Sequence, residues 1–588
     1  MKIKVSDYIF EYLLSKNITT TFSVSGGAAA HLLDSARKYK INYIANYHEQ
    51  ASTMAAEGYA RIKNHPALVL VTNGPGSSNT ITGVVGAYQD SIPMFIISGQ
   101  VPVNQTLNSN PNLRQVGVQE VDIIKIVDSI TKYSAQILDP TTIKYHLDRA
   151  YYECINGRKG PVWLDIPLDI QSSLVEIEEL EGYFPPKKIS SNHNYKEIIE
   201  IISKSKRPLI ITGNGIHLSN TENQFRNLLN KLQIPTISTW TSKDLFDYND
   251  PLFVGSFGLL GERSGNFAVQ KADLLLILGS RLSIPNIGYK TELFSPNSTK
   301  IMVDVDENEL NKSTLNIHYK IKKDLNDFFP EFINQIPSDF SKWGKWINET
   351  NQWKNKYSVF LPEYKVNKDK INSFYFIEIL SKHLKDNNVV VTDMGTSYTC
   401  THQALRTNGK NRLYTSSSCC SMGFGLPGAI GSFYGNPNNE IILIAGDGGF
   451  QMNIQELQTI FHYNLPIKIF VLNNNGYLAI SLMQDNLFDG KYIGSTPNSG
   501  VSSPDFTKIA KAYGIESVRF TNNHQLENNI KKVLEHQGPI LCEIETPEHQ
   551  LLIPRVQSKK DKNGKITSTS IENMFPFLSD KEMKNIMS

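Results

Sequence analysis

Short, continuous runs of aliphatic residues recur along this sequence and end in glycine or small polar residues. Residues 67–72, 272–278 and 440–445 are three such runs, and a glycine-containing turn follows each. Between the runs, apolar residues recur at three- and four-residue spacing, as in residues 454–461. Continuous apolar runs are typical of parallel strands buried on both faces, whereas the wider spacing predicts amphipathic helices. The alternation predicts α/β domains in which helices cover both faces of a parallel sheet.

A chain of 588 residues is too long for one hydrophobic core. We expect an α/β fold with three doubly wound parallel-sheet domains, over residues 1–180, 190–340 and 365–555. An acidic and then Pro- and Lys-rich stretch, 172–188, is the expected first linker, and the Trp-rich residues 340–366 are predicted to form a surface helix and connector. The basic and then apolar residues 556–588 form either a docked tail or a lid whose basic groups meet phosphates.

Composition excludes several classes of protein. The hydrophobic fraction of 40% and the charged fraction of 20% are those of an ordinary globular protein, and a net charge of +2 gives no reason to expect nucleic acid as a partner. No apolar run approaches the ~20 residues that span a bilayer, and the N-terminus enters an amphipathic helix without a signal peptide. Five cysteines show neither metal-binding spacing nor a disulfide framework, which favours a cytoplasmic location.

Two polar clusters follow neighbouring predicted strands of the third domain. Gly446-Asp447-Gly448-Gly449 ends the run 440–445, and Asn473-Asn474-Asn475-Gly476-Tyr477 ends the run 467–472. Open α/β sheets bind ligands at the carboxyl ends of their strands, and Mg²⁺ prefers oxygen ligands such as those of Asp447 and Asn474. Either cluster alone is typical of a tight turn or hairpin loop. Together, with one helix between them, they predict a magnesium and diphosphate site.

The pair resembles the cofactor motif of thiamine diphosphate-dependent enzymes. The resemblance implies that Asp447, Asn474 and the carbonyl of Gly476 bind Mg²⁺. It also implies that the third domain binds the cofactor's diphosphate. The residues expected to contact the cofactor there are Gly395, Thr396, Ser397, Gly446, Gly448, Gly449, Asn474, Tyr477 and Leu478. The string 421–431 resembles one in which a bulky side chain lies under the thiazolium ring and bends the cofactor, a position that Met422 occupies here.

The first domain resembles the pyrimidine-binding domain of the acetolactate synthase branch. The resemblance rests on Tyr47-His48-Glu49-Gln50-Ala51, on 55–61 and on Gly74-Pro75-Gly76. It implies that Glu49 contacts the aminopyrimidine ring and performs acid–base catalysis, and that Gly26, Gly27 and Gly74 lie at the cofactor. Gln119 matches a glutamine of the substrate channel, and Val118 stands where the synthases have phenylalanine. The smaller side chain would admit a larger acceptor.

The central domain resembles the one that holds FAD in the synthases and that is empty or binds a nucleotide in other relatives. Arg281 and Asp304 occupy positions that would contact the flavin's diphosphate and ribose. No G-x-G-x-x-G fingerprint is present, and Gly258-Leu259-Leu260-Gly261 replaces the synthases' string. FAD and a purely structural domain both stay open.

The resemblance implies a carboligase that removes CO₂ from a 2-oxo acid, with pyruvate the expected donor, and transfers the two-carbon unit to an acceptor carbonyl. A homodimer or homotetramer is expected, because the family's cofactor lies between the first domain of one subunit and the third of its partner. One alternative is acetyl transfer to a nucleotide-linked keto-sugar, favoured by Val118, the altered string and the tail ending Glu572-Asn573-Met574-Phe575-Pro576. The other is a catalytically inactive paralogue, which the joint presence of Glu49, Asp447 and Asn474 disfavours.

Overall fold

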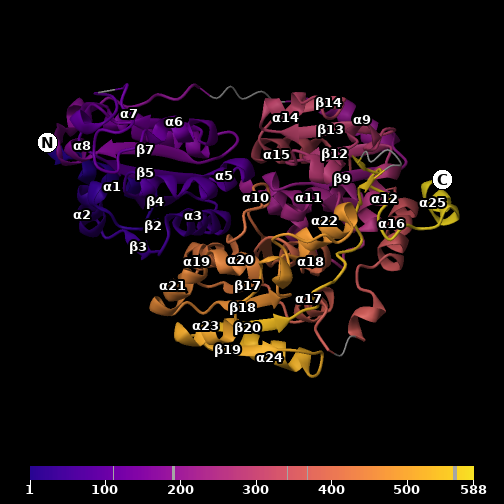
Figure 1. Cartoon of the computed structure of the whole chain (residues 1–588). Coiled ribbons are helices and arrows are strands. Elements are labelled where there is room, and N and C mark those ends of the chain that lie inside the picture. The colour runs from indigo at the N-terminus through magenta and orange to yellow at the C-terminus, as the bar shows by residue number, and fades with distance from the viewer. Residues whose placement is uncertain (110, 188–192, 339, 341, 367–368, 561–565) are drawn as a thin grey trace.

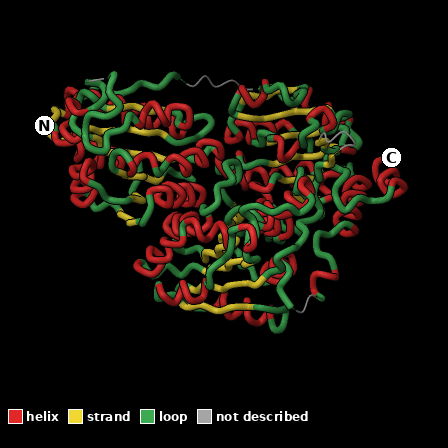
Figure 2. Tube along the Cα trace, in the orientation of Figure 1, coloured by secondary structure: helices red, strands yellow, loops and turns green. Residues whose placement is uncertain are grey.

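The computed structural model contains three α/β domains, each built on a six-stranded, all-parallel sheet (Figure 1). It describes residues 1–109, 111–187, 193–338, 340, 342–366, 369–560 and 566–588. In each domain the strands lie in layers between helices (Figure 2). The fold class expected from the sequence is confirmed. Among the described residues, no helix is both long enough and apolar enough to cross a bilayer.

The first and third sheets share one topology. The first has the order β3-β2-β4-β5-β7-β6 and the third β16-β15-β17-β18-β20-β19, so that in both the second strand of the sheet along the chain lies at the edge, beside the first. The strands of the first sheet are β2 (Thr20–Ser23), β3 (Asn42–Ala45), β4 (Ala67–Val71), β5 (Met94–Gln100), β6 (Tyr133–Gln136) and β7 (Val162–Pro167). Those of the third are β15 (Asn388–Thr392), β16 (Arg412–Tyr414), β17 (Glu440–Gly446), β18 (Lys468–Asn473), β19 (Glu516–Phe520) and β20 (Ile540–Glu545).

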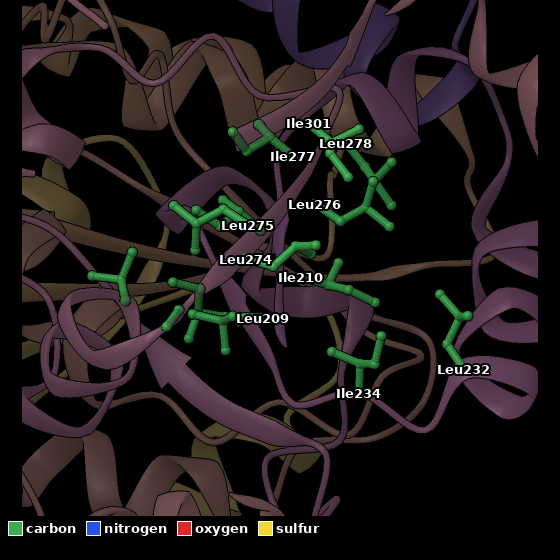
Figure 3. Packing of buried hydrophobic residues seen from close by; sticks show 14 of the residues in the cluster. Leu209, Ile210, Leu232, Ile234, Leu274, Leu275, Leu276, Ile277, Leu278 and Ile301 are labelled. Carbon is green, nitrogen blue, oxygen red and sulfur yellow. The ribbon is translucent and has the colours of Figure 1, made fainter. Parts of the chain in front are cut away.

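The central sheet has a different order, β11-β10-β9-β12-β13-β14, which is the strand order of dinucleotide-binding folds. Its strands are β9 (Pro208–Thr212), β10 (Thr236–Ser238), β11 (Phe253–Ser256), β12 (Leu274–Leu278), β13 (Thr299–Asp304) and β14 (Tyr319–Lys322). Figure 3 shows the aliphatic residues of β9 and β12 packed at the centre of this domain. The order reverses direction between β9 and β12, where such sheets open a crevice for a ligand.

The first and third domains share a core. Helix α3 (Glu49–Lys63) of the first packs against α19 (Gly425–Gly435) of the third, and one apolar cluster covers the facing sides of both sheets. The helices approach closely because glycines lie at the crossing: a Cβ on Gly431 would come within 1.8 Å of the carbonyl oxygen of Ala55. The other face of the first sheet is covered by α1 (Val5–Ser15), α2 (Ala30–Lys38) and α7 (Ile143–Ile155).

The helix predicted in the Trp-rich segment is present, but its tryptophan face is buried. Helix α16 (Gly344–Lys356) packs on α12 (Arg263–Lys271), and Trp346 and Trp353 are buried. Trp343 is also buried, and its indole N–H donates to the carbonyl of Ser205. The tryptophans form the inner face of the helix, whereas its lysines and asparagines made the segment look polar in the sequence.

The described part of the C-terminal tail docks on the central domain. Arg555 pairs with Phe575, and the side chain of Met574 is fully buried. Helix α25 (Asp580–Met587) ends the chain against α12. Lys562 and Lys565, two of the basic residues considered for a lid, lie outside the described residues.

Candidate active site

The carboxylate of Asp447 lies at the carboxyl end of β17, as its place after an apolar run predicted. It is the first residue of α20 (Asp447–Met452) and is 4% exposed. One oxygen accepts from the backbone N–H of Gly448, and the other from Gly476 N–H at 3.1 Å and the Ser503 hydroxyl at 2.7 Å. Burial raises the pKa of Asp447 above its ordinary value. A charge buried this deeply favours a bound cation.

Asn474 follows β18, the strand beside β17, and brings a second oxygen to the same edge. Its side-chain Oδ1 is buried and has no hydrogen-bond partner among the described residues. A buried carbonyl without a partner is rare and costs ~1–3 kcal/mol, so a missing ligand is the natural explanation. An amide oxygen and a carboxylate on adjacent strands fit a hard divalent cation, which Asp447, Asn474 and Gly476 would hold.

The loop after β15 completes this edge of the third sheet. Gly395 has a φ of +83°, and α18 (Thr396–Ala404) starts directly after it. The Ser397 hydroxyl donates to the carbonyls of Asp393 and Met394, and a Cβ on Gly446 would lie 3.8 Å from that hydroxyl. The structure therefore brings the loop of Gly395, Thr396 and Ser397, which we expect to contact the cofactor, to the glycine turn at 446–449.

Asp393, which no sequence motif marked as a site residue, organises this loop. Its buried carboxylate accepts from the backbone N–H groups of Met394, Gly423 and Gly425. Burial raises its pKa to about 6. A Cβ on Gly449 would come within 2.2 Å of its Oδ1, so glycine is required there. Only its position after an apolar run could have marked it.

Met422, Gly448 and Tyr477 lie together. A Cβ on Gly448 would come within 3.2 Å of the Met422 methyl and 2.3 Å of the Tyr477 ring. Helix α22 (Leu478–Phe488) starts after Tyr477, but the Leu478 side chain points into the core of the third domain. Leu478 therefore offers only its backbone to this site.

Glu49 begins α3 in the first domain. The preceding residue, His48, caps the helix by accepting from Gln50 N–H through its ring Nδ1, and a carboxylate at a helix start is favoured by the helix dipole. Glu49 is half-buried, and the Asn79 side-chain amide donates to its Oε2 at 3.0 Å. No sequence motif marked Asn79, which lies three residues after Gly74-Pro75-Gly76.

Several of the other predicted residues of the first domain are connected to Glu49 through the loop at 72–76. A Cβ on Gly76 would lie 3.8 Å from Glu49 Oε1, and a Cβ on Gly74 would meet the Gln119 carbonyl at 2.3 Å. Gly26 packs against Thr72, whose methyl also lies under Gly76, whereas Gly27 has open space around it. Gln119 is exposed and has a φ of +58°. Its neighbour Val118 is 81% exposed.

The predicted site residues of the first and third domains thus form two groups in one chain. The pocket beside Asp447 is lined by Gly448, Gln451, Gly476, Tyr477 and residues 501–504, all from the third domain. Glu49 and Gln119 are not among the residues that line it. Val118 is exposed beside Gln119, and Ile480, on the helix α22 that follows Tyr477, is 42% exposed.

A larger cavity, of about 680 Å³, lies at the switch point of the central sheet. The loops after β9, β10, β11, β12 and β13 line it, together with residues of the first and third domains. Arg281 and Asp304, the residues expected to contact a flavin, both line it. Arg281 also donates to the Ser418 hydroxyl of the third domain at 2.5 Å, and burial raises the pKa of Asp304 to about 6. The volume of this cavity is that of a cofactor site.

Three family models match successive parts of the chain. The thiamine pyrophosphate enzyme N-terminal TPP binding domain matches residues 3–126, the central domain 195–332, and the C-terminal TPP binding domain 393–544. Each match falls on one of the three sheets described above. The fold and the matches define the class as a thiamine diphosphate-binding, three-domain protein.

Curated relatives match over nearly the whole chain. The acetolactate synthase large subunit of Cyanidium caldarium is 30% identical over 562 residues, covering 92% of this chain and 93% of the relative. The chloroplastic acetolactate synthase 1 of Nicotiana tabacum is 31% identical over 94% of this chain and 83% of its own length. The large subunit of Lactococcus lactis is 29% identical, with 94% of each chain covered. The chain belongs to the thiamine diphosphate-dependent enzymes, in the branch that resembles acetolactate synthases, and is an enzyme of transferase or lyase type.

Proposed function

We propose that this enzyme is a Mg²⁺-dependent carboligase that decarboxylates a 2-oxo acid, pyruvate in the first instance, and transfers the two-carbon unit to an acceptor carbonyl. The relatives named as acetolactate synthases support this reaction class. The observation that carries the metal and diphosphate part is the buried Asp447 carboxylate beside the unpartnered Oδ1 of Asn474. Both are oxygen donors, and both lie at the end of adjacent parallel strands.

The residues have distinct proposed roles. Asp447, Asn474 and Gly476 hold the cation, which neutralises the diphosphate. Thiamine diphosphate, when bound, supplies the nucleophilic carbon and the electron sink for decarboxylation. Glu49 exchanges a proton with the pyrimidine ring, and the Met422 side chain supports a bent cofactor. Gln119 lies where the substrate would enter.

We propose that two chains complete each active centre, in a homodimer or a dimer of dimers. The separation of Glu49 from the Asp447 pocket supports this, since neither group closes a site alone. Exposed apolar side chains accompany both groups: Val118 at 81% and Tyr47 at 55% on the first domain, and Ile493 at 79% on the third. Apolar residues exposed in numbers around a binding group favour a covered interface.

The cavity of the central domain is the proposed FAD site. The cavity lies between β9 and β12, where the strand order of the sheet reverses direction. This position, the size of the cavity and the cationic side chain of Arg281 support a dinucleotide ligand. The indole N–H of Trp240, which lines the cavity, has no partner among the described residues and could donate to such a ligand. All five cysteines are free thiols, in keeping with the proposed cytoplasmic location.

A second candidate acceptor is a nucleotide-linked keto-sugar. The observation that favours it is Val118, which is 81% exposed beside Gln119, because a small side chain where the synthases have an aromatic ring would admit a larger acceptor. The two candidates differ only in the acceptor, because the donor chemistry and the cofactor are shared.

One series of experiments tests the proposal. Purified protein, stripped of ligands and resupplied with Mg²⁺ and thiamine diphosphate, is given pyruvate, and CO₂ release is measured for wild type and Glu49→Gln. We expect release from wild type and a loss of at least roughly 100-fold in the variant. Mass spectrometry of the products, with pyruvate alone and then with keto-sugar nucleotides, distinguishes the acceptors. Visible absorbance of the purified protein reports a flavin. Absence of saturable cofactor uptake would refute the proposal.

A further inference from the structure

The segment from Asp447 to Glu456, which starts the connection between the two polar clusters, is not one continuous helix. It consists of α20, a break at Asn453 and the 3₁₀ turn η9 (Ile454–Glu456), followed by α21 (Leu457–His462). Asn453 breaks the helix because its side-chain amide donates to the carbonyl of Gly423, the residue after Met422, at 2.7 Å. The break turns Glu456 away from the metal-site face and toward the first domain.

Glu456 is fully buried between the third domain and the loop that precedes Glu49. Its Oε1 accepts from the backbone N–H of Tyr47 at 2.9 Å. Its Oε2 accepts from the Asn46 side-chain amide at 2.9 Å and from the Thr459 hydroxyl at 2.7 Å. The loop between β3 and α3 is therefore fixed by a carboxylate of another domain.

A second contact supports the same loop. The Tyr463 hydroxyl, at the end of α21, accepts from the backbone N–H of Ala45 at 3.0 Å. The residues that follow, Asn46 to His48, lead directly into the helix that Glu49 begins. A shift of this loop would move the Glu49 carboxylate, and misplacement of a catalytic group by about 1 Å can cost roughly 100-fold in rate.

We infer that Glu456 is a positioning residue for the Glu49 of its own chain, so that one short segment serves two active centres. Its first residue, Asp447, binds the metal of one centre, and its last, Glu456, orients the acid–base residue of the other. This inference rests on the proposed sharing of each centre between two chains.

Variants that carry the same substitution in every chain test the positioning role. In Glu456→Ala, Tyr47 N–H and the Asn46 amide lose their acceptor, and we expect kcat to fall roughly 10-fold. Affinity for Mg²⁺ and thiamine diphosphate, measured by fluorescence titration, should stay within about twofold, because Asp447 and Asn474 are intact. Hydrogen exchange of residues 45–48 should accelerate. Glu456→Gln should restore most of the activity, because its oxygen still accepts from Tyr47 and the Asn46 amide can rotate to offer its unpartnered Oδ1.

Matched variants separate positioning from general destabilisation. Glu262→Ala removes another buried glutamate, which accepts from Ser256 N–H and the Tyr248 hydroxyl in the central domain. We expect it to lower the melting temperature without changing the exchange of residues 45–48. Tyr463→Phe is a milder substitution than Glu456→Ala and should give an intermediate loss of kcat if Glu456→Ala does not fold. An unchanged kcat in both Glu456→Ala and Tyr463→Phe would overturn the inference. Equal losses in kcat and cofactor affinity in these two variants would overturn it as well.

Mixed dimers test on which centre Glu456 acts. Pairing a Glu49→Gln chain with an Asp447→Ala chain leaves one intact centre, made of Glu49 from the second chain and Asp447 from the first. Glu456→Ala added to the Asp447→Ala chain should reduce its activity roughly 10-fold, and added to the other chain should change it less than about twofold. The reverse pattern would overturn the inference. If the starting pair has no activity, the sharing of centres is wrong, and with it the claim that one segment serves two of them.

Discussion

The ring of Tyr477 lies directly over Gly448, so closely that a methyl group on Gly448 would come within 2.3 Å of the ring. The two residues belong to the two polar clusters that end β17 and β18, and the Met422 methyl would lie 3.2 Å from the same added methyl group. The backbone of Gly448 is helical, a conformation that any residue can adopt. Glycine is therefore required at 448 by the packing of the neighbouring side chains and not by the backbone. The floor of the proposed cofactor site is thus formed by packing between the two motifs.

Substitution of Gly448 by alanine should displace Tyr477 and weaken cofactor binding. We expect Gly448→Ala to reduce the affinity for thiamine diphosphate roughly 10-fold or more, because overpacking at a well-packed contact costs about 1–3 kcal/mol. Fluorescence titration of the Mg²⁺-loaded protein measures this. Gly344→Ala is the control, because a Cβ at Gly344 would have no neighbour within 4 Å. Unchanged affinity in Gly448→Ala would show that the ring moves freely.

Asn79 should matter for catalysis through Glu49. Its amide donates to Glu49 Oε2 at 3.0 Å, and a hydrogen bond to a charged group is worth about 1.5–3 kcal/mol. We expect Asn79→Ala to lower kcat/KM for pyruvate roughly 10- to 100-fold, with little change in thiamine diphosphate affinity. Ser78→Ala, the substitution of an exposed neighbour on the same turn, should have no such effect. Comparable losses in both variants would point to disruption of the turn instead.

Much of this site could be predicted because parallel strands bring their carboxyl ends to one edge. The apolar runs before Asp447 and Asn474 were sufficient to place both side chains together, as the structure shows. The helix break at Asn453 could not be predicted, because it depends on a hydrogen bond to Gly423, far away in the sequence. Asn79 and Glu456 were missed for the same reason: each acts through a tertiary contact that no local pattern records.

The stability of the protein should depend on pH through Asp304. Burial raises its pKa from 3.8 to about 6. Because the folded state binds this proton more tightly than the unfolded state, the contribution of Asp304 to the free energy of unfolding falls as the pH rises through that interval. Asp304→Asn removes this dependence. Its stability relative to wild type should therefore rise by ~1–3 kcal/mol across the interval and then stay constant.

Urea unfolding without added ligands, at several pH values across and above this interval, measures the effect. The asparagine oxygen can still accept from Asp306 N–H, the hydrogen bond that Asp304 makes, so the loop should persist. Asp386→Asn removes one exposed carboxylate of the third domain and is the control for the loss of one charge. Parallel pH profiles for wild type and Asp304→Asn would contradict the prediction.

Asn474 should affect the ligand-free and the loaded enzyme in opposite directions. Without a ligand its buried Oδ1 has no partner among the described residues, so Asn474→Ala removes an unsatisfied group and should leave the melting temperature unchanged or raise it. With Mg²⁺ and thiamine diphosphate, wild type gains stability by mass action, whereas the variant lacks one metal ligand and should gain much less. Thermal melts with and without both ligands, followed by chelation of the metal, measure this. A variant that is destabilised without ligands, yet stabilised by them as strongly as wild type, would show that Asn474 supports the fold and does not bind the cation.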